Sequence, residues 1–190
     1  MVVLTLPVHA QTVLDMSVDP VSVNWDLIDE GAGATGSLSG GILDIDCPSA
    51  MAFYGYRAPM ADWETASIAG QWAVEARVHL IEQAVTNDPI RGALHLGAGD
   101  GARYFVLVVH PDKIEFYETA GSGPYSGTWS YAMDTTDGFH VYRMEVDGPL
   151  VDVYVDGTLV MSASNDGSSA VSGDESSWSA LRSQYQDSNR

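Results

Sequence analysis

The sequence predicts an all-β fold of antiparallel strands, either a sandwich or a barrel, and three observations lead to this prediction. Apolar and polar residues alternate with a period of two in short runs, which recur at roughly ten-residue spacing with Gly-rich turns between them. Asp-Gly pairs, a strong signal for tight hairpins, join the last of these runs. Apart from one turn near residues 81–85, no stretch has helical periodicity with capping residues.

The N-terminal part of the chain contains short predicted strands separated by loops. Residues 31–41 are rich in Gly, Ser, Ala and Thr, and we expect a loop there. Residues 42–46 alternate, and the aromatic run 52–56 is a second strand that ends before Pro59. In residues 72–81 apolar side chains alternate with mostly polar ones, which predicts a strand with one apolar face.

Two further strands are predicted in the middle of the chain. Residues 90–97 repeat the alternation and place Arg91 and His95 on the face opposite the apolar side chains. Residues 104–110 are apolar on both faces, which is typical of a central strand of a sheet.

The remaining strands follow in quick succession. In residues 113–119, Ile114 and Phe116 lie on one face, and Glu115 and Tyr117 lie on the other. After a second Gly-rich loop, residues 128–131 form another short predicted strand. Three more strands are predicted at 139–146, 150–155 and 158–163, and Asp-Gly pairs join them into two hairpins.

The length and composition favour one globular domain. A chain of 190 residues, 45% of them hydrophobic, is large enough to bury a core and is unlike a disordered chain. We expect one domain over residues 12–180 and a polar tail over 181–190. Residues 1–11 are either the remnant of a signal peptide, with a cleavage site after Ala10, or a first edge strand. Cys47 is the only cysteine, so no internal disulfide forms, and we expect a half-buried structural thiol.

The charge of the chain restricts its partners. The formal net charge is −18, which repels the phosphates of nucleic acids and the headgroups of anionic lipids. No apolar run approaches the ~20 residues that a membrane-spanning helix needs. An acidic surface with a single lysine suits extracellular or saline surroundings, although the charge also serves plain solubility.

Several stretches resemble the concanavalin A-like lectin/glucanase superfamily, which includes laminin-G-like modules. The sequences FHVYRMEVDG at 139–148 and VDVYVDGTLV at 151–160 resemble a hairpin pair of these domains. GGILDI at 40–45 and WAVEARV at 72–78 look like further strands of the same domains, and Gly173-Asp174 is similar to their turn before the last strand. The resemblance implies an antiparallel two-sheet jelly-roll β-sandwich. It leaves the activity open, because this fold carries lectins, hydrolases, lyases and adhesion modules.

Some enzymes of this superfamily have catalytic motifs that can be compared with the chain. The E-x-D-x-x-E strand of its retaining glucanases, whose carboxylates lie about 5 Å apart, has no counterpart here. Against the R-x-E-x-R and Q-I-H strands of alginate lyases, the chain has Glu75 and Arg77, with Ala73 for the leading Arg, and His95, with Ala93 for the Gln. If the protein is an enzyme, Glu75, Arg77 and His95 are the catalytic candidates, provided that their strands are neighbours. The alternative is a solvated face of ion pairs.

Sugar binding requires aromatic platforms and planar polar groups, and the chain offers both. Five Trp and nine Tyr outnumber four Phe, and several lie in polar or Gly-rich contexts or on outward strand faces. The predicted ligand-binding residues are Arg91, His95, Trp63, Tyr125, Trp129 and Tyr117.

A transition-metal site is not indicated, because the five histidines have no metal-ligand spacing. Two loops offer the hard oxygen ligands that Ca²⁺ prefers, and many members of the superfamily that the chain resembles carry a structural Ca²⁺. The predicted ligands are Asp134, Asp137, Asp166 and Asp174.

These observations favour a secreted, non-catalytic carbohydrate-binding or adhesion module whose partner is a polysaccharide or glycan. One alternative is a polysaccharide lyase or glycoside hydrolase that acts on the concave sheet face. The other is a structural domain of a larger surface protein.

Overall fold

The computed structural model describes residues 16–30, 33–48, 53–57, 71–83, 94–99, 103–120, 127–147 and 150–164. These residues form twelve strands and one short 3₁₀ helix, so the all-β prediction is confirmed. The strands make four antiparallel sheets, none of which closes into a barrel in the described part of the chain.

Contacts along the chain divide it into two compact units, Met1–Trp72 and Ala73–Arg190. The division falls inside strand β5 (Gln71–Val78). One domain over residues 12–180 stays a prediction, and residues 1–11 and 181–190 lie outside the described residues.

The first unit contains the 3₁₀ helix η1 (Pro20–Val23) and two pairs of strands. Strand β1 (Asp26–Glu30) pairs with β4 (Phe53–Arg57). Strand β2 (Thr35–Ser39) pairs with β3 (Ile42–Asp46) through a two-residue turn, in which Gly40 and Gly41 have φ of 60° and 78°. Both positive φ values fit the turn type that glycine favours in tight hairpins.

The expected loop over residues 31–41 is therefore wrong in part, because β2 lies within it. Its sequence TGSLS has a single large apolar side chain, so the strand shows little hydrophobic alternation. Pairing with β3 stabilises it instead. The glycine in this strand has a structural role, since a Cβ on Gly36 would overlap the ring of Tyr54.

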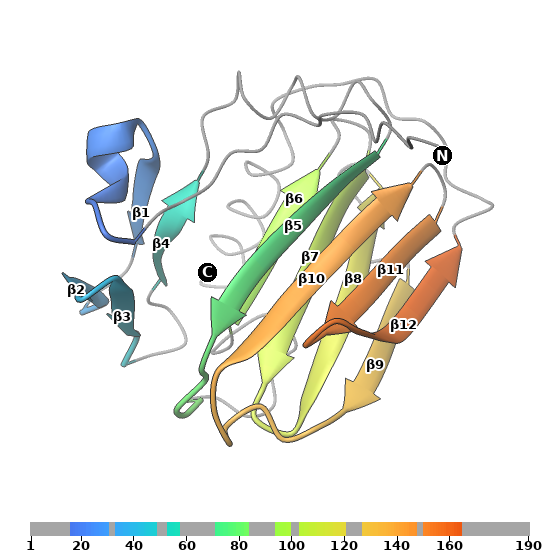
Figure 1. Cartoon of the computed structure of the whole chain (residues 1–190). Helices are drawn as coiled ribbons and strands as arrows, with labels where there is room; N and C mark the ends of the chain where they lie inside the picture. The colour runs from blue at the N-terminus through green and yellow to red at the C-terminus, as the bar shows by residue number, and fades with distance from the viewer. Residues whose placement is uncertain are drawn as a thin grey trace, which may run out of the picture. The chain divides into compact units, whose positions relative to one another are not determined.

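The second unit contains two four-stranded antiparallel sheets. The first has the order β12-β11-β10-β5 and adds to β5 the strands β10 (His140–Asp147), β11 (Leu150–Val155) and β12 (Thr158–Ser164). The second has the order β6-β7-β8-β9, with β6 (Leu94–Gly99), β7 (Arg103–His110), β8 (Lys113–Ala120) and β9 (Gly127–Ala132). Figure 1 shows them as two layers, with β5 and β10 to β12 in front of β6 to β9.

The core of the second unit comes from alternating side chains on both sheets. On β10 and β11 every second side chain is buried, and these are Tyr142, Met144, Val146, Val151, Val153 and Val155. On β7 and β8 it buries Phe105, Leu107, Val109, Ile114 and Phe116, and the rings of Phe105 and Phe116 stack at 5.9 Å. Each large side chain buried in this way contributes roughly 1.5–3 kcal/mol of hydrophobic free energy.

Two predictions about this unit are confirmed. Strand β7 is buried on both faces from Phe105 to His110 and lies between β6 and β8, as expected of a central strand. The hairpin β11–β12 turns at Asp156-Gly157, as predicted, with Val155 paired to Thr158. In the hairpin β10–β11 Asp147 is paired with Leu150, so Asp147 ends β10 and is not part of the turn, contrary to the prediction.

Candidate functional site

Polar side chains collect on one face of the β6–β9 sheet, opposite the face that carries Phe105 and Phe116. They are His95 of β6, His110 of β7, and Lys113, Glu115 and Tyr117 of β8, which we call the Glu115 face. The register explains their proximity: Val108 is paired with Glu115 on one side and with His95 on the other. His110 is paired with Lys113, so three neighbouring strands contribute to the face.

Glu115 is the centre of this cluster, and its side chain is only 10% exposed. Lys113 Nζ donates to Oε1 at 2.6 Å, and Tyr117 donates its hydroxyl to Oε2. Nε2 of His110 lies 3.1 Å from the same Oε2. Burial raises the pKa of the Glu115 carboxyl, but the hydrogen bonds from Lys113 and Tyr117 outweigh burial and hold the pKa below its ordinary value. Glu115 is therefore a carboxylate at neutral pH.

His110 connects this cluster to other parts of the second unit. Its side chain is 7% exposed, and its Nδ1 lies 3.3 Å from Oε1 of Gln83, in the segment after β5. Its carbonyl oxygen accepts a 2.5 Å hydrogen bond from the hydroxyl of Thr135, which is fully buried. The imidazole therefore lies between Gln83 and Glu115, and the bond from Thr135 holds the backbone of His110.

The cluster reaches solvent at the end near β9. The Lys113 side chain is 39% exposed, whereas Val106 and Val108 on the same face are buried. Ser130 is paired with Glu115 and Ala132 is paired with Lys113, and both of these β9 residues are exposed.

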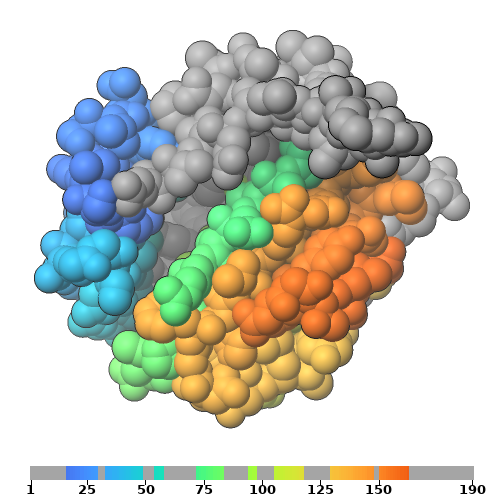
Figure 2. Space-filling view, in the orientation of Figure 1, coloured from blue at the N-terminus to red at the C-terminus, as the bar shows by residue number. Residues whose placement is uncertain are grey.

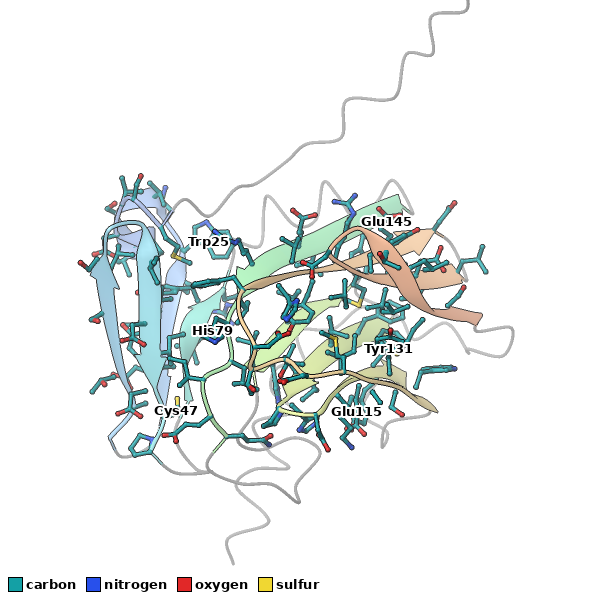
Figure 3. The ribbon with its side chains drawn as sticks, turned by 60° about the horizontal axis from the view of Figure 1, so that its bottom comes forward. Trp25, Cys47, His79, Glu115, Tyr131 and Glu145 are labelled. Atoms are coloured by element: carbon teal, nitrogen blue, oxygen red, sulfur yellow. The ribbon has the colours of Figure 1, made fainter. Side chains whose placement is uncertain are left out.

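The outer face of the other sheet carries a different polar group, which we call the ion-pair face. It contains Glu75 of β5, Arg143 and Glu145 of β10, and Tyr154 of β11. Arg143 donates to Glu145 at 2.6 Å and to Glu75 at 3.2 Å, and all three side chains are 41–51% exposed. Burial and the negative charges of Glu145 and Asp152 raise the pKa of the Tyr154 hydroxyl. This sheet forms the green and orange surface of Figure 2, and Figure 3 shows Glu145 and Glu115 on opposite outer sides of the two layers.

The catalytic candidates do not come together. Strand β5, with Glu75 and Arg77, pairs with β10, whereas His95 lies on β6 in the other sheet. A shared face required β5 and β6 to be neighbours, and among the described strands this condition is not met. Glu75 is bonded to Arg143, and the guanidinium of Arg77 lies 4.7 Å from the ring centroid of Phe139. The surroundings of Glu75 and Arg77 agree with the alternative to a catalytic site, a solvent-exposed sheet face with ion pairs.

The predicted ligand-binding residues divide into three groups. His95 and Tyr117 share the Glu115 face. Trp129 lies on the opposite face of the same sheet, where its half-buried ring packs on Phe116 at 5.2 Å. Arg91, Trp63 and Tyr125 lie outside the described residues.

Of the predicted Ca²⁺ ligands, Asp134 and Asp137 are described and both carboxylates have partners. Asp134 accepts from the amide and hydroxyl of Thr136, which lower the pKa of its carboxyl, and Asp137 lies 2.7 Å from His140. Asp166 and Asp174 lie outside the described residues. Within the described ranges, no group of three or more His, Cys, Asp or Glu side chains is arranged to hold a metal ion. Bound Ca²⁺ stays a prediction.

Sequence reasoning missed the two residues that organise the site, Glu115 and His110. The alternation in residues 113–119 already placed Glu115 beside Tyr117 and opposite Ile114 and Phe116. His110 gave no comparable signal, since it stands at the end of an apolar strand and its role depends on the β7–β8 turn.

Comparison with protein-family models, with curated proteins and with solved structures finds no match to this chain. Among the described residues, no helix has the length and apolar character needed to cross a membrane.

Proposed function

We propose that this protein is a secreted, non-catalytic carbohydrate-binding module that binds a glycan on its Glu115 face. The observation that carries the proposal is the carboxylate of Glu115, which accepts hydrogen bonds from Lys113 and Tyr117 and lies 3.1 Å from His110. The same proposal includes three further features. The fold is a jelly-roll sandwich of the concanavalin A-like type, the protein is exported from the cell, and it binds a structural Ca²⁺.

The chemistry of the Glu115 face suits sugar hydroxyls. Carbohydrate sites combine a few fixed polar groups, and a carboxylate accepts hydrogen bonds from hydroxyl groups with charge assistance. The bonds from Lys113 and Tyr117 fix the carboxylate of Glu115, so a ligand meets it already oriented. Ser130, exposed beside Glu115, adds a hydroxyl that both donates and accepts.

The fold gives the proposal independent support. Two facing antiparallel sheets in hairpin-connected order agree with a sandwich. The segments that resemble the superfamily hairpin pair form β10, β11 and β12, which pair in sequence order.

The test is a panel of neutral and uronate-containing polysaccharides, with Ca²⁺ present and with a chelator. Binding, new reducing ends and the absorbance of unsaturated uronates are measured in the same wells. Retention on a glycan without product supports the proposal. Released oligosaccharides would instead identify a hydrolase or a lyase, and a chain that neither binds nor cleaves would be a structural domain.

A pair of variants locates the site. Tyr117→Phe removes a hydroxyl that orients Glu115, and we expect about a fivefold weaker Kd for the bound glycan, the effect of one lost hydrogen bond. Tyr154→Phe is the matched control, because it removes a tyrosine hydroxyl on the ion-pair face, where the charges of Glu145 and Asp152 act on it. Its Kd should equal that of the wild type. Equal losses in both variants would argue against a site on the Glu115 face.

A further inference from the structure

The charges on the Glu115 face cancel one another. Lys113 is the only lysine of the sequence, and its ammonium lies 2.6 Å from Oε1 of Glu115. Glu115 is in turn held ionised, so the pair presents one positive and one negative group with no net charge. Tyr117 and His110 lie against the other carboxylate oxygen, Oε2, and leave Oε1 to Lys113 and to a ligand hydroxyl.

An acidic sugar would have to break this pairing. A uronate or sulfate group needs a cation, and Lys113 can serve it only by leaving Glu115, whose side chain is 10% exposed. A buried carboxylate that loses its partner is strongly destabilised, so the exchange is unfavourable. The chain as a whole has a formal charge of −18, which repels a polyanion before it reaches the site.

A neutral sugar meets none of these costs. Its hydroxyl groups can donate to Glu115, accept from the remaining hydrogens of Lys113 and bond to Ser130 while the ion pair stays intact. We infer that the ligand of the Glu115 face is an uncharged, hydroxyl-rich glycan and not a uronate or sulfated one. This inference rests on the proposed function and specifies its ligand class.

The first experiment compares ligands that differ only in charge. Polygalacturonate and alginate are each tested beside their carboxyl-reduced, neutral products, together with a neutral β-glucan, a mannan and a xylan. We expect wild-type protein to bind a neutral glycan with a Kd that does not change with NaCl concentration, since no ion pair with the ligand forms. A preference for uronate polymers that weakens with salt would overturn the inference and leave the proposed function standing. Binding to no member of either class would overturn both.

The second experiment changes the charge of the site. Glu115→Gln keeps the size of the side chain but leaves Lys113 as an unpaired cation. We expect affinity for the neutral glycan to fall about tenfold, as for a lost charged hydrogen bond, and affinity for uronate polymers to rise.

Glu145→Gln is the matched control. It removes one negative charge, as Glu115→Gln does, but on the ion-pair face. Like Glu115, Glu145 accepts a 2.6 Å hydrogen bond from a cation, which here is Arg143. It should leave the affinities for both classes unchanged. If Glu115→Gln does not change the preference, or if Glu145→Gln changes it equally, the inference is wrong. Where Glu115→Gln fails to fold, the comparison of charged and reduced polymers on the wild type decides the question.

Discussion

At the scale of single residues, the structure explains why one small side chain stands inside a strand. Glycine normally weakens a strand, because it loses more conformational freedom on folding and offers nothing to pack. In β2, however, the ring of Tyr54 occupies the space where a Cβ of Gly36 would stand. The ring is fixed further by an edge contact with Tyr56, with centroids 6.0 Å apart. The glycine thus makes room for an aromatic side chain from the neighbouring pair of strands.

Gly36→Ala should therefore destabilise the protein. We expect the free energy of unfolding to fall by about 1–3 kcal/mol, the usual cost of overpacking, as measured by urea denaturation. Gly55→Ala is the control, because a Cβ there meets no atom within 4 Å. In a Tyr54→Ala background, the Gly36→Ala substitution should cost much less, because the ring that it overlaps is gone. Equal stability of the Gly36→Ala and Gly55→Ala variants would contradict this explanation.

At the scale of elements, the connection from β9 to β10 is tied to its surroundings on several sides. Thr135 bonds to the β7–β8 turn, and the carbonyl of Thr136 lies 3.1 Å from Nε2 of His79. At its end, the ring nitrogens of His140 lie 2.8 Å from Asp156 and 2.7 Å from Asp137. His140 therefore joins the connection to the β11–β12 turn.

This histidine makes stability depend on pH. The hydrogen bond to Asp156 raises the pKa of His140, burial opposes it, and the bond to Asp137 adds to the rise. Since the folded-state pKa lies above the unfolded one, the stabilisation is fully present below about pH 6.5 and is lost as pH rises through the raised pKa. His140→Gln should reduce this loss, which urea denaturation at a series of pH values above 6 measures. Parallel curves for the variant and the wild type would refute the assignment.

How much of these elements the sequence predicts depends on the signal that each contains. The β10–β11–β12 hairpins were predictable, because alternation and Asp-Gly turns are local features. Strand β2 was missed, since its stability depends on pairing with β3. The residues of β5 do not indicate which strand pairs with it, because the order of strands in a sheet is a tertiary property. For that reason the sequence could not show that β5, with Glu75 and Arg77, and β6, with His95, lie in different sheets. The polar neighbours of Tyr117 could be predicted from alternation, but the contact of His110 with Glu115 required the folded turn.

At the scale of the whole molecule, the formal charge of −18 dominates the electrostatics. The described ion pairs offset little of it: those on the surface, such as Arg57 with Asp26 at 2.8 Å, are each worth up to about 1 kcal/mol. Repulsion among the remaining carboxylates opposes compaction of the chain.

Added salt should therefore stabilise the protein. We expect the free energy of unfolding to rise when NaCl increases from low ionic strength to about 0.15 M, where the screening length shortens to about 8 Å. Thermal unfolding at matched pH measures the change, with KCl in place of NaCl as the control for a specific ion effect. A fall in Tm with salt would mean that the attractive pairs outweigh the net repulsion.

The buried position of Thr135 has a consequence for cooperativity. This residue stands in the connection that leads from β9 of one sheet to β10 of the other. Its amide donates to the carbonyl oxygen of Pro111 in the β7–β8 turn, and its hydroxyl donates to the carbonyl oxygen of His110 at the end of β7. The next residue, Thr136, contacts the segment after β5 in the other layer, because its carbonyl oxygen lies 3.1 Å from Nε2 of His79. The connection is therefore bonded to both layers, and Thr135 within it is fully buried. The two layers of the second unit are therefore expected to lose their structure in one transition, as a single folding unit rather than as two independent sheets.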